Sequence, residues 1–279
     1  MLVPFLIMLR EGIEAALIVG IIAGYLRQTG RGEWMPLVWI GIAIAVLLSL
    51  GVGITLDLVS AEFPQREQEL FEAAVGMIAV GILTSMVFWM RKAARSIKAQ
   101  LQHSVDTALH SAETGTGSGF ALIAMVFFAV AREGLESVFF LLATFQQDAG
   151  WAAPAGALAG ILVSVAVGIA VTWAGVRLNL KRFFRWTGLF ILVVAAGLLA
   201  GALRSLHEAG LWNALQETAF DLSSILPADS PLGSVLAGIF GYQDRPAVGE
   251  VALYLLFLAV TLPLFLAGGQ APREARSNA

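Results

Sequence analysis

The sequence contains no cysteine, which excludes disulfide bonds and thiolate metal sites. Charged residues are scarce as well: they make up 13% of the 279 residues, about half the share found in soluble domains. Hydrophobic residues, in contrast, reach 58%. The composition therefore excludes a soluble globular protein and predicts an all-α, multi-pass membrane protein.

Signal-peptide and enzyme signatures are also missing. The N-terminus has no basic region, and Arg10 and Glu11 interrupt its first apolar run, so we interpret that run as a retained span. The sequence has no H-E-x-x-H or G-x-S-x-G motif and no nucleophile beside a base. We therefore expect no enzyme, although an intramembrane enzyme that uses paired carboxylates is the alternative from another class.

Long apolar runs are abundant. A helix needs about 20 apolar residues to cross the hydrocarbon core of a bilayer. Windows of this length predict seven transmembrane helices, near residues 2–26, 35–57, 69–90, 119–145, 153–175, 186–206 and 249–269.

The connections between these runs differ in charge. Lys and Arg gather after the first and third spans, between the fifth and sixth spans, and in the tail at Arg273 and Arg276. The connections 58–68, 146–152 and 207–248 are acidic instead. Because basic connections stay in the cytoplasm, we expect the N-terminus outside and the C-terminus inside.

Two five-residue motifs place charges within apolar runs. Arg10-Glu11-Gly12-Ile13-Glu14 lies in the run 2–26, and Arg132-Glu133-Gly134-Leu135-Glu136 lies in the run 120–145. An ionised side chain at mid-depth costs about 2.5–3.5 kcal/mol even on a lenient scale, so each Arg-Glu-Gly-x-Glu (REGxE) motif is a candidate site. Helical spacing puts both acids of a motif on one face and lets each arginine reach the glutamate four residues later.

The motifs carry more acid than base. Four glutamates against two arginines leave two negative charges in excess, which a dry interior keeps only with protons or a bound cation. Carboxylates suit hard cations. A purely structural role for the Arg–Glu pairs is the alternative. The predicted cation site comprises Glu11, Glu14, Glu133 and Glu136, with Arg10 and Arg132 as supporting ion-pair partners.

The motifs belong to a longer internal repeat. Segment 48–54 resembles 163–169, and 81–83 resembles 197–199. Three spans per unit place the copies in opposite orientations, the inverted-repeat plan of many transporters. Gly12 and Gly134 are expected to let the two motif helices approach each other closely.

The chain then divides into five parts. They are a first repeat (1–90), a cytoplasmic linker (91–118), a second repeat (119–206), an extracytoplasmic segment (207–248), and the seventh helix with a cytoplasmic tail (249–279).

Shorter elements are expected outside the spans. Apolar residues at four-residue spacing from Ile97 to Leu109 predict an amphipathic surface helix, and the glycines of 115–119 predict a flexible joint. In the extracytoplasmic segment we expect a helix around 211–222 and a short interfacial or re-entrant piece over 232–240.

The third span begins with further acids. Glu69 and Glu72 follow Glu62 and Glu67, so they form a candidate approach lane for a cation. An ordinary pair of interfacial acids near a helix N-terminus is the alternative.

The sequence resembles the iron permeases of the oxidase-linked high-affinity uptake systems, fungal and bacterial. The resemblance rests on both REGxE motifs, the seven-span plan, the acidic start of the third span, His207-Glu208-Ala209-Gly210 and Gly241-Tyr242. It implies that iron, as Fe²⁺ or Fe³⁺, crosses the cell inner membrane along the motif residues. Glu69 and Glu72 match the family by position rather than by spacing.

The resemblance also implies periplasmic iron-delivery or iron-oxidising partner proteins, and no nucleic-acid partner is expected. The residues alone leave other transport functions open. Hard oxygen ligands also serve manganese or lead, and nothing in the sequence fixes the direction of transport, so an exporter is a further alternative.

Overall fold

The computed structural model describes residues 2–61, 63–93, 97–113, 119–145, 151–173, 180–228 and 230–267. Within these residues the chain is helical, apart from an isolated β-bridge between Thr218 and Ala247. The helices are α1 (Leu2–Gln28), η1 (Gly32–Trp34), α2 (Met35–Ala61), α3 (Gln65–Ala93), α4 (Ile97–Glu113), α5 (Phe120–Phe145), α6 (Ala152–Trp173), α7 (Leu180–Glu208), α8 (Pro231–Phe240) and α9 (Val248–Ala267).

Each apolar run that was expected to span the membrane forms a helix. Among the described residues, five segments are long and apolar enough to cross a bilayer, and they correspond to α2, α3, α6, α7 and α9. The helices α1 and α5 are 27 and 26 residues long, but each carries the three charges of its motif. The all-α membrane fold is therefore confirmed, and the full count of seven spans remains a prediction.

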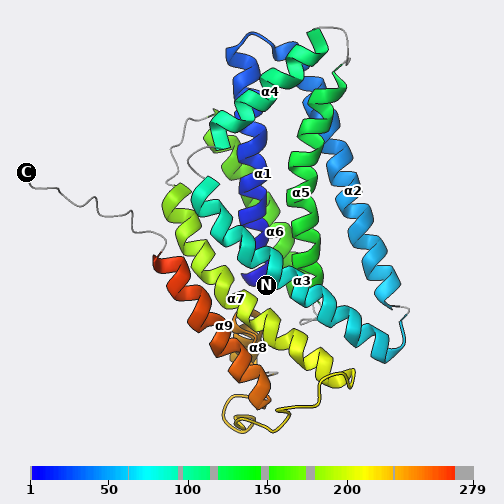
Figure 1. Cartoon of the computed structure of the whole chain (residues 1–279), viewed down its shortest axis with the longest axis vertical. Helices are drawn as coiled ribbons and strands as arrows, with labels where there is room; N and C mark the ends of the chain where they lie inside the picture. Colours follow the sequence, from blue (N-terminus) through cyan, green and yellow to red (C-terminus); the bar gives the residue numbers. More distant parts are fainter. Residues whose placement is uncertain are drawn as a thin grey trace, which may run out of the picture.

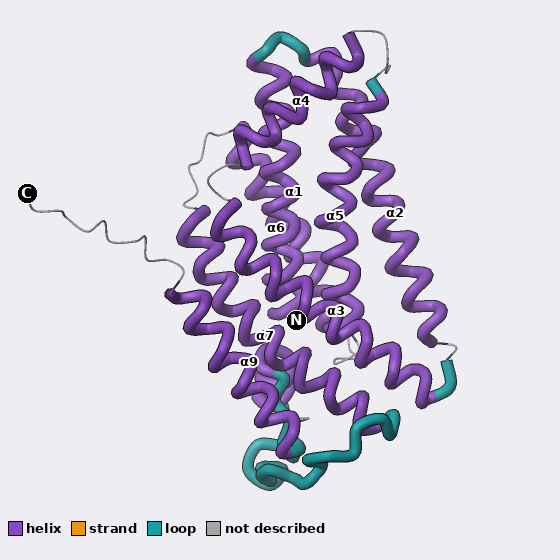
Figure 2. Tube along the Cα trace, viewed as in Figure 1, coloured by secondary structure: helices purple, strands orange, loops and turns teal. Residues whose placement is uncertain are grey.

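The helices pack in pairs, and each of the main pairs joins a helix from the first half of the chain to one from the second half. The most extensive contacts join α1 to α6, α2 to α5, and α3 to α7. Figure 1 shows α1, α2 and α5 standing along the long axis, with α3, α7 and α9 inclined across the lower part. One apolar core is built mainly from α3, α5 and α7, and a second joins α1, α2, α4 and α5. Loops gather at the two far ends of the molecule (Figure 2).

The predicted amphipathic helix of the linker is confirmed as α4. Val105 and Leu109 are fully buried in the core shared with α1 and α5. The Tyr25 hydroxyl of α1 contacts both carboxylate oxygens of Asp106 at 2.6 and 2.7 Å. Helix α4 is therefore fastened to one end of the motif helices. The expected joint at Gly115 and Gly117 lies outside the described residues, as do several acidic and basic residues used for the orientation, namely Glu62, Arg95, Asp148, Arg177, Asp229, Arg273 and Arg276.

The helix expected around residues 211–222 is wrong. That segment pairs with 244–249 instead: the Ala219 amide donates to the Pro246 carbonyl at 2.9 Å, and the Val248 amide donates to the Glu217 carbonyl at 2.8 Å. Leu215 has φ of 59°, which a helix does not allow. Tertiary pairing thus outweighs the local helix pattern.

The short apolar piece of the outer segment forms the ten-residue helix α8. The Ser230 hydroxyl accepts the Gly233 amide at 3.0 Å and so caps the N-terminus. Gly241 ends the helix at φ 67°, a left-handed conformation that glycine adopts without strain. At ten residues α8 is too short to span a bilayer.

Candidate functional site

The first motif lies within α1, and its charged side chains are buried. Arg10, Glu11 and Glu14 are 2%, 2% and 7% exposed. Arg10 Nη1 lies 3.4 Å from Glu11 Oε1, and Arg10 Nε lies 3.1 Å from Glu14 Oε1. The second distance comes from the i, i+4 spacing expected from the sequence. One guanidinium thus serves two carboxylates.

The second motif lies within α5 and is more open. Arg132 Nε donates to Glu136 Oε1 at 2.9 Å, which is again the i, i+4 pair. The Arg132 side chain is 46% exposed, and its guanidinium carbon lies 4.7 Å above the ring of Trp89 on α3. An arginine over an indole face gains a cation–π attraction. The two arginines are therefore not equivalent, although the motifs have the same sequence pattern.

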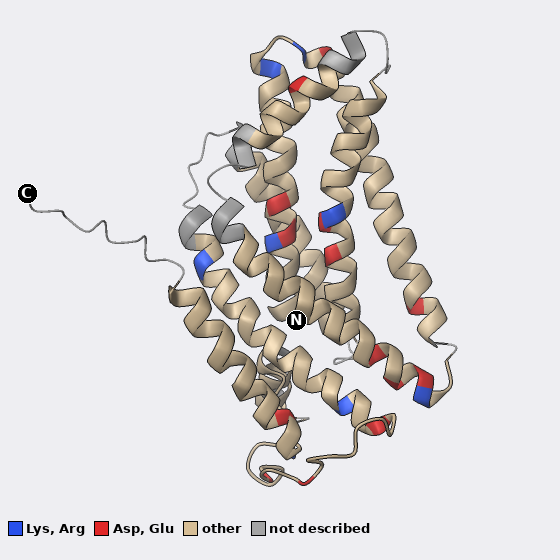
Figure 3. Cartoon of the chain, in the orientation of Figure 1, with Lys and Arg blue, Asp and Glu red and all other residues tan. Residues whose placement is uncertain are grey.

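Carboxylates from both motifs converge. Glu11 of α1 and Glu133 and Glu136 of α5 each offer one oxygen atom, and these oxygens lie within 4.8 Å of one another. Glu14 is not part of this group and lies against Arg10 instead. Figure 3 shows that the charged residues are found mainly toward the ends of the molecule and in one group partway along α1 and α5.

These acids keep unused ligand atoms. Within the described residues, the buried carboxylate oxygens without a hydrogen-bond partner are Glu11 Oε2, Glu14 Oε1, Glu133 Oε2 and Glu136 Oε2. The Glu14 oxygen is close to Arg10, but the two are not aligned as a hydrogen bond. A buried, unsatisfied carboxylate oxygen is costly. An oxygen-rich group of this kind fits a hard cation in passage.

The motif glycines contact different helices from those expected. A Cβ atom on Gly12 would lie 2.0 Å from Ser164 Oγ of α6, and one on Gly134 would lie 2.2 Å from Ser49 Oγ of α2. The expectation that Gly12 and Gly134 bring α1 and α5 together is therefore wrong. The glycines instead allow close packing of α1 against α6 and of α5 against α2. The acidic faces of α1 and α5 are therefore not used in these contacts and lie toward each other.

Replacing Gly12 by alanine tests this contact. Because the added methyl group would overlap Ser164, Gly12→Ala should destabilise the protein by about 1–3 kcal/mol, seen as a lower unfolding temperature in detergent. Ser164→Gly should restore stability in the double variant. Gly24→Ala on the same helix is the control, since nothing lies within 4 Å of its added Cβ. Equal stability of the Gly12 and Gly24 variants would contradict the contact.

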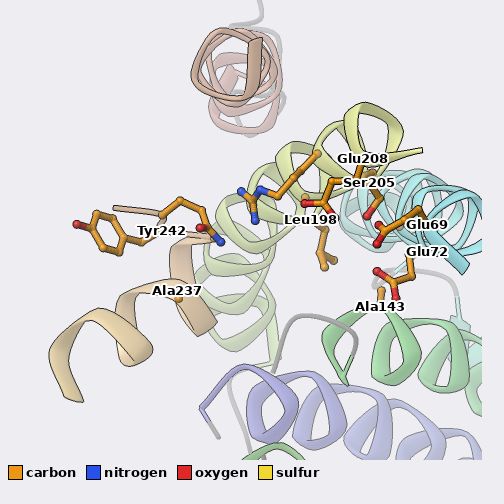
Figure 4. Close-up of a pocket in the computed structure, with 15 residues that line it drawn as sticks. Glu69, Glu72, Ala143, Leu198, Ser205, Glu208, Ala237 and Tyr242 are labelled. Carbon is orange, nitrogen blue, oxygen red and sulfur yellow. The ribbon is translucent and has the colours of Figure 1, made fainter. Parts of the chain in front are cut away.

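A separate pocket of about 230 Å³ holds the third-span acids. Glu69 and Glu72 of α3 and Glu208 of α7 point toward one another in it (Figure 4). Ala143 of α5 also lines this pocket. It lies seven residues beyond Glu136, which is about 10 Å along the helix. Of the six predicted acids, the structure thus brings Glu11, Glu133 and Glu136 together, leaves Glu14 beside Arg10, and places Glu69 and Glu72 in this separate pocket.

Sequence reasoning missed part of this pocket. Glu208 is not among the predicted site residues, yet it lines the pocket together with Glu69 and Glu72 although its side chain is exposed. Arg204 and Tyr242 also line the pocket. Their separation from Glu69 along the chain hides the contact. The resemblance motifs around Glu208 and Tyr242 are the one signal that marked these positions.

Comparison with known proteins identifies the family of this chain. Residues 1–269 match the iron permease FTR1 family. The ferrous iron permease EfeU of Yersinia pestis is 57% identical over 265 residues, which are 95% of this chain and 93% of that protein. EfeU of Escherichia coli O157:H7 is 57% identical over 279 residues, 99% of this chain and 100% of that protein. No solved structure matches the chain. The match over almost its whole length shows that this chain belongs to the iron permease FTR1 family.

Proposed function

We propose that this permease moves iron across the cell inner membrane through the carboxylates of its two REGxE motifs. Membership of an iron permease family identifies a transporter rather than an enzyme. The convergence of Glu11, Glu133 and Glu136 oxygens within 4.8 Å is the observation that carries the proposal. Glu14 completes the excess of two negative charges over Arg10 and Arg132 that a divalent cation would balance.

The pairing of helices supports an inverted repeat. If α1, α2 and α3 correspond to α5, α6 and α7, exchanging the two sets turns the α1–α6 contact into α5–α2 and leaves the α3–α7 contact unchanged. The Gly12–Ser164 and Gly134–Ser49 contacts exchange in the same way. Such a relation is that of two copies around a two-fold axis, as in an inverted repeat. We take the orientation, with the N-terminus outside, from the loop charges.

This orientation makes the pocket of Glu69, Glu72 and Glu208 the outer approach to the motif acids. It places α4 on the cytoplasmic side and the segment 209–247 outside, where periplasmic iron-delivery or iron-oxidising proteins would dock. Reporter fusions after residue 100 and residue 225 test it, with the first expected inside and the second outside. The reverse result would refute the orientation, and two reporters on the same side would refute the inverted repeat.

The transport activity itself is tested with the purified full chain in liposomes. We expect uptake of radioactive iron that empty liposomes do not show. Ferrous iron is the first form to test, because the similar proteins are named ferrous iron permeases, and ferric iron is the second. Manganese and zinc serve as competitors. Manganese uptake without uptake of iron in either oxidation state would contradict the proposal and favour another hard cation.

A further inference from the structure

A partly buried ion pair lies beside the outer pocket. Arg204 of α7 lines that pocket together with the three acids. Its guanidinium donates two hydrogen bonds to the carboxylate of Glu250, in the first turn of α9: Nε donates to Oε1 at 3.3 Å, and Nη2 donates to Oε2. The Glu250 side chain is 7% exposed and the Arg204 side chain is 29% exposed. The pair thus joins Arg204, which lines the pocket, to Glu250, which does not.

The charge of Arg204 matters for a cation that enters this pocket. Arg204 lies near enough to Glu208 to attract its carboxylate, and Arg204 is the one cation among the described lining residues. With Glu250 absent, its guanidinium would turn to the pocket acids. The guanidinium would then form an ion pair with a carboxylate that would otherwise attract iron, and its positive charge would repel the metal ion.

We propose that Glu250 is a positioning residue for iron uptake: it neutralises Arg204 so that the acids of the outer pocket remain available to the cation. Glu250 does not line the pocket, so it acts through Arg204 and not by contact with iron. The inference rests on the proposed role of the pocket as the outer approach.

The competing explanation is that the pair only holds α9 against α7. The two roles predict different results for single and double variants. A mechanical role predicts that the loss of either partner lowers the amount of folded protein and that the loss of both can recover it, but it gives no reason for the KM to change. A neutralising role makes the loss of Glu250 harmful only while Arg204 is still charged and present.

The experiment measures the KM for iron in liposomes that contain the full chain. Glu250→Gln keeps size and an acceptor oxygen for Arg204 but removes the charge, and we expect the KM to rise about tenfold. Adding Arg204→Gln should return the KM to within about twofold of the parent value. Arg204→Gln alone should reduce the amount of folded protein, since it leaves Glu250 buried and unpaired, without raising the KM.

A matched control comes from an exposed ion pair in the segment 207–248, between α7 and α9. Asp221 and Arg245 lie 3.1 Å apart and are 53% and 61% exposed. Asp221→Asn makes the same change in net charge away from the pocket, and its KM should match that of the parent. Because KM does not depend on the amount of protein, a lower yield does not hide the comparison.

Several results would overturn the inference. They are an unchanged KM in Glu250→Gln, a double variant as impaired as that single variant, or an equal rise in Asp221→Asn. A failure here is distinguishable from failure of the transport site. If Glu72→Gln leaves the KM unchanged while Glu133→Gln abolishes uptake, the mid-helix site stands and only the role of the outer pocket is lost.

Discussion

Glu133→Gln should yield a folded permease whose iron uptake is reduced by about 100-fold or more. Changing a group that only orients a metal ligand already costs about 10–100-fold, and Glu133 supplies one of the converging oxygens itself. The amide keeps the size of the side chain and removes a buried negative charge. Folding should therefore survive while the cation loses its charge partner.

Uptake of radioactive iron per amount of inserted protein is the measurement. Glu11→Gln and Glu136→Gln are expected to behave in the same way, since their oxygens belong to the same group. Glu33→Gln is the matched control, because Glu33 lies exposed in η1, away from both acid groups. Normal uptake by well-expressed amide variants of both motifs would show that the acids only hold helices together.

Arg10→Ala should be far more damaging to the fold than Arg132→Ala. Arg10 is 2% exposed and faces both Glu11 and Glu14, so its loss leaves two buried acids without their cation. Removing one partner of a buried ion pair costs about 3–5 kcal/mol. The Arg132 side chain is 46% exposed and forms its ion pair with Glu136, so its removal leaves one acid rather than two without a cation, and the cost should be smaller.

The comparison needs the unfolding temperature and the amount of each variant in detergent. Arg10→Gln combined with Glu14→Gln should recover much of the lost stability, because it removes one acid together with its partner, yet uptake should stay low. Equal destabilisation by Arg10→Ala and Arg132→Ala would show that the difference in burial has no energetic weight.

The helices were predictable because lipid imposes a simple rule on the sequence. About 20 apolar residues in succession satisfy that rule, and the seven predicted runs coincide with helices to within a few residues at most ends. The spacing within each motif likewise fixed the Arg10–Glu14 and Arg132–Glu136 pairs. Both features depend on neighbours along the chain.

Features that depend on distant neighbours were not predictable. The partners of Gly12 and Gly134 are serines on other helices, and the same small residue would suit contact with any helix. The unequal exposure of Arg10 and Arg132 depends on how helices distant in the sequence pack around each motif, as Trp89 of α3 does against Arg132. The helix predicted over 211–222 was wrong for the same reason, since the hydrogen bonds of this segment go to residues that follow α8.

The crossed pairing of helices has a consequence for biosynthesis. Helix α1 is the first to leave the ribosome, with three charged side chains that end up buried. Its main packing partner, α6, begins only at Ala152, and the carboxylates that face Glu11 belong to α5. The translocon therefore has to accommodate a charged helix until more than half of the chain has been made. Ribosome-bound chains that stop before α6 should consequently remain sensitive to membrane proteases and chaperones, and those that include α7 should become resistant.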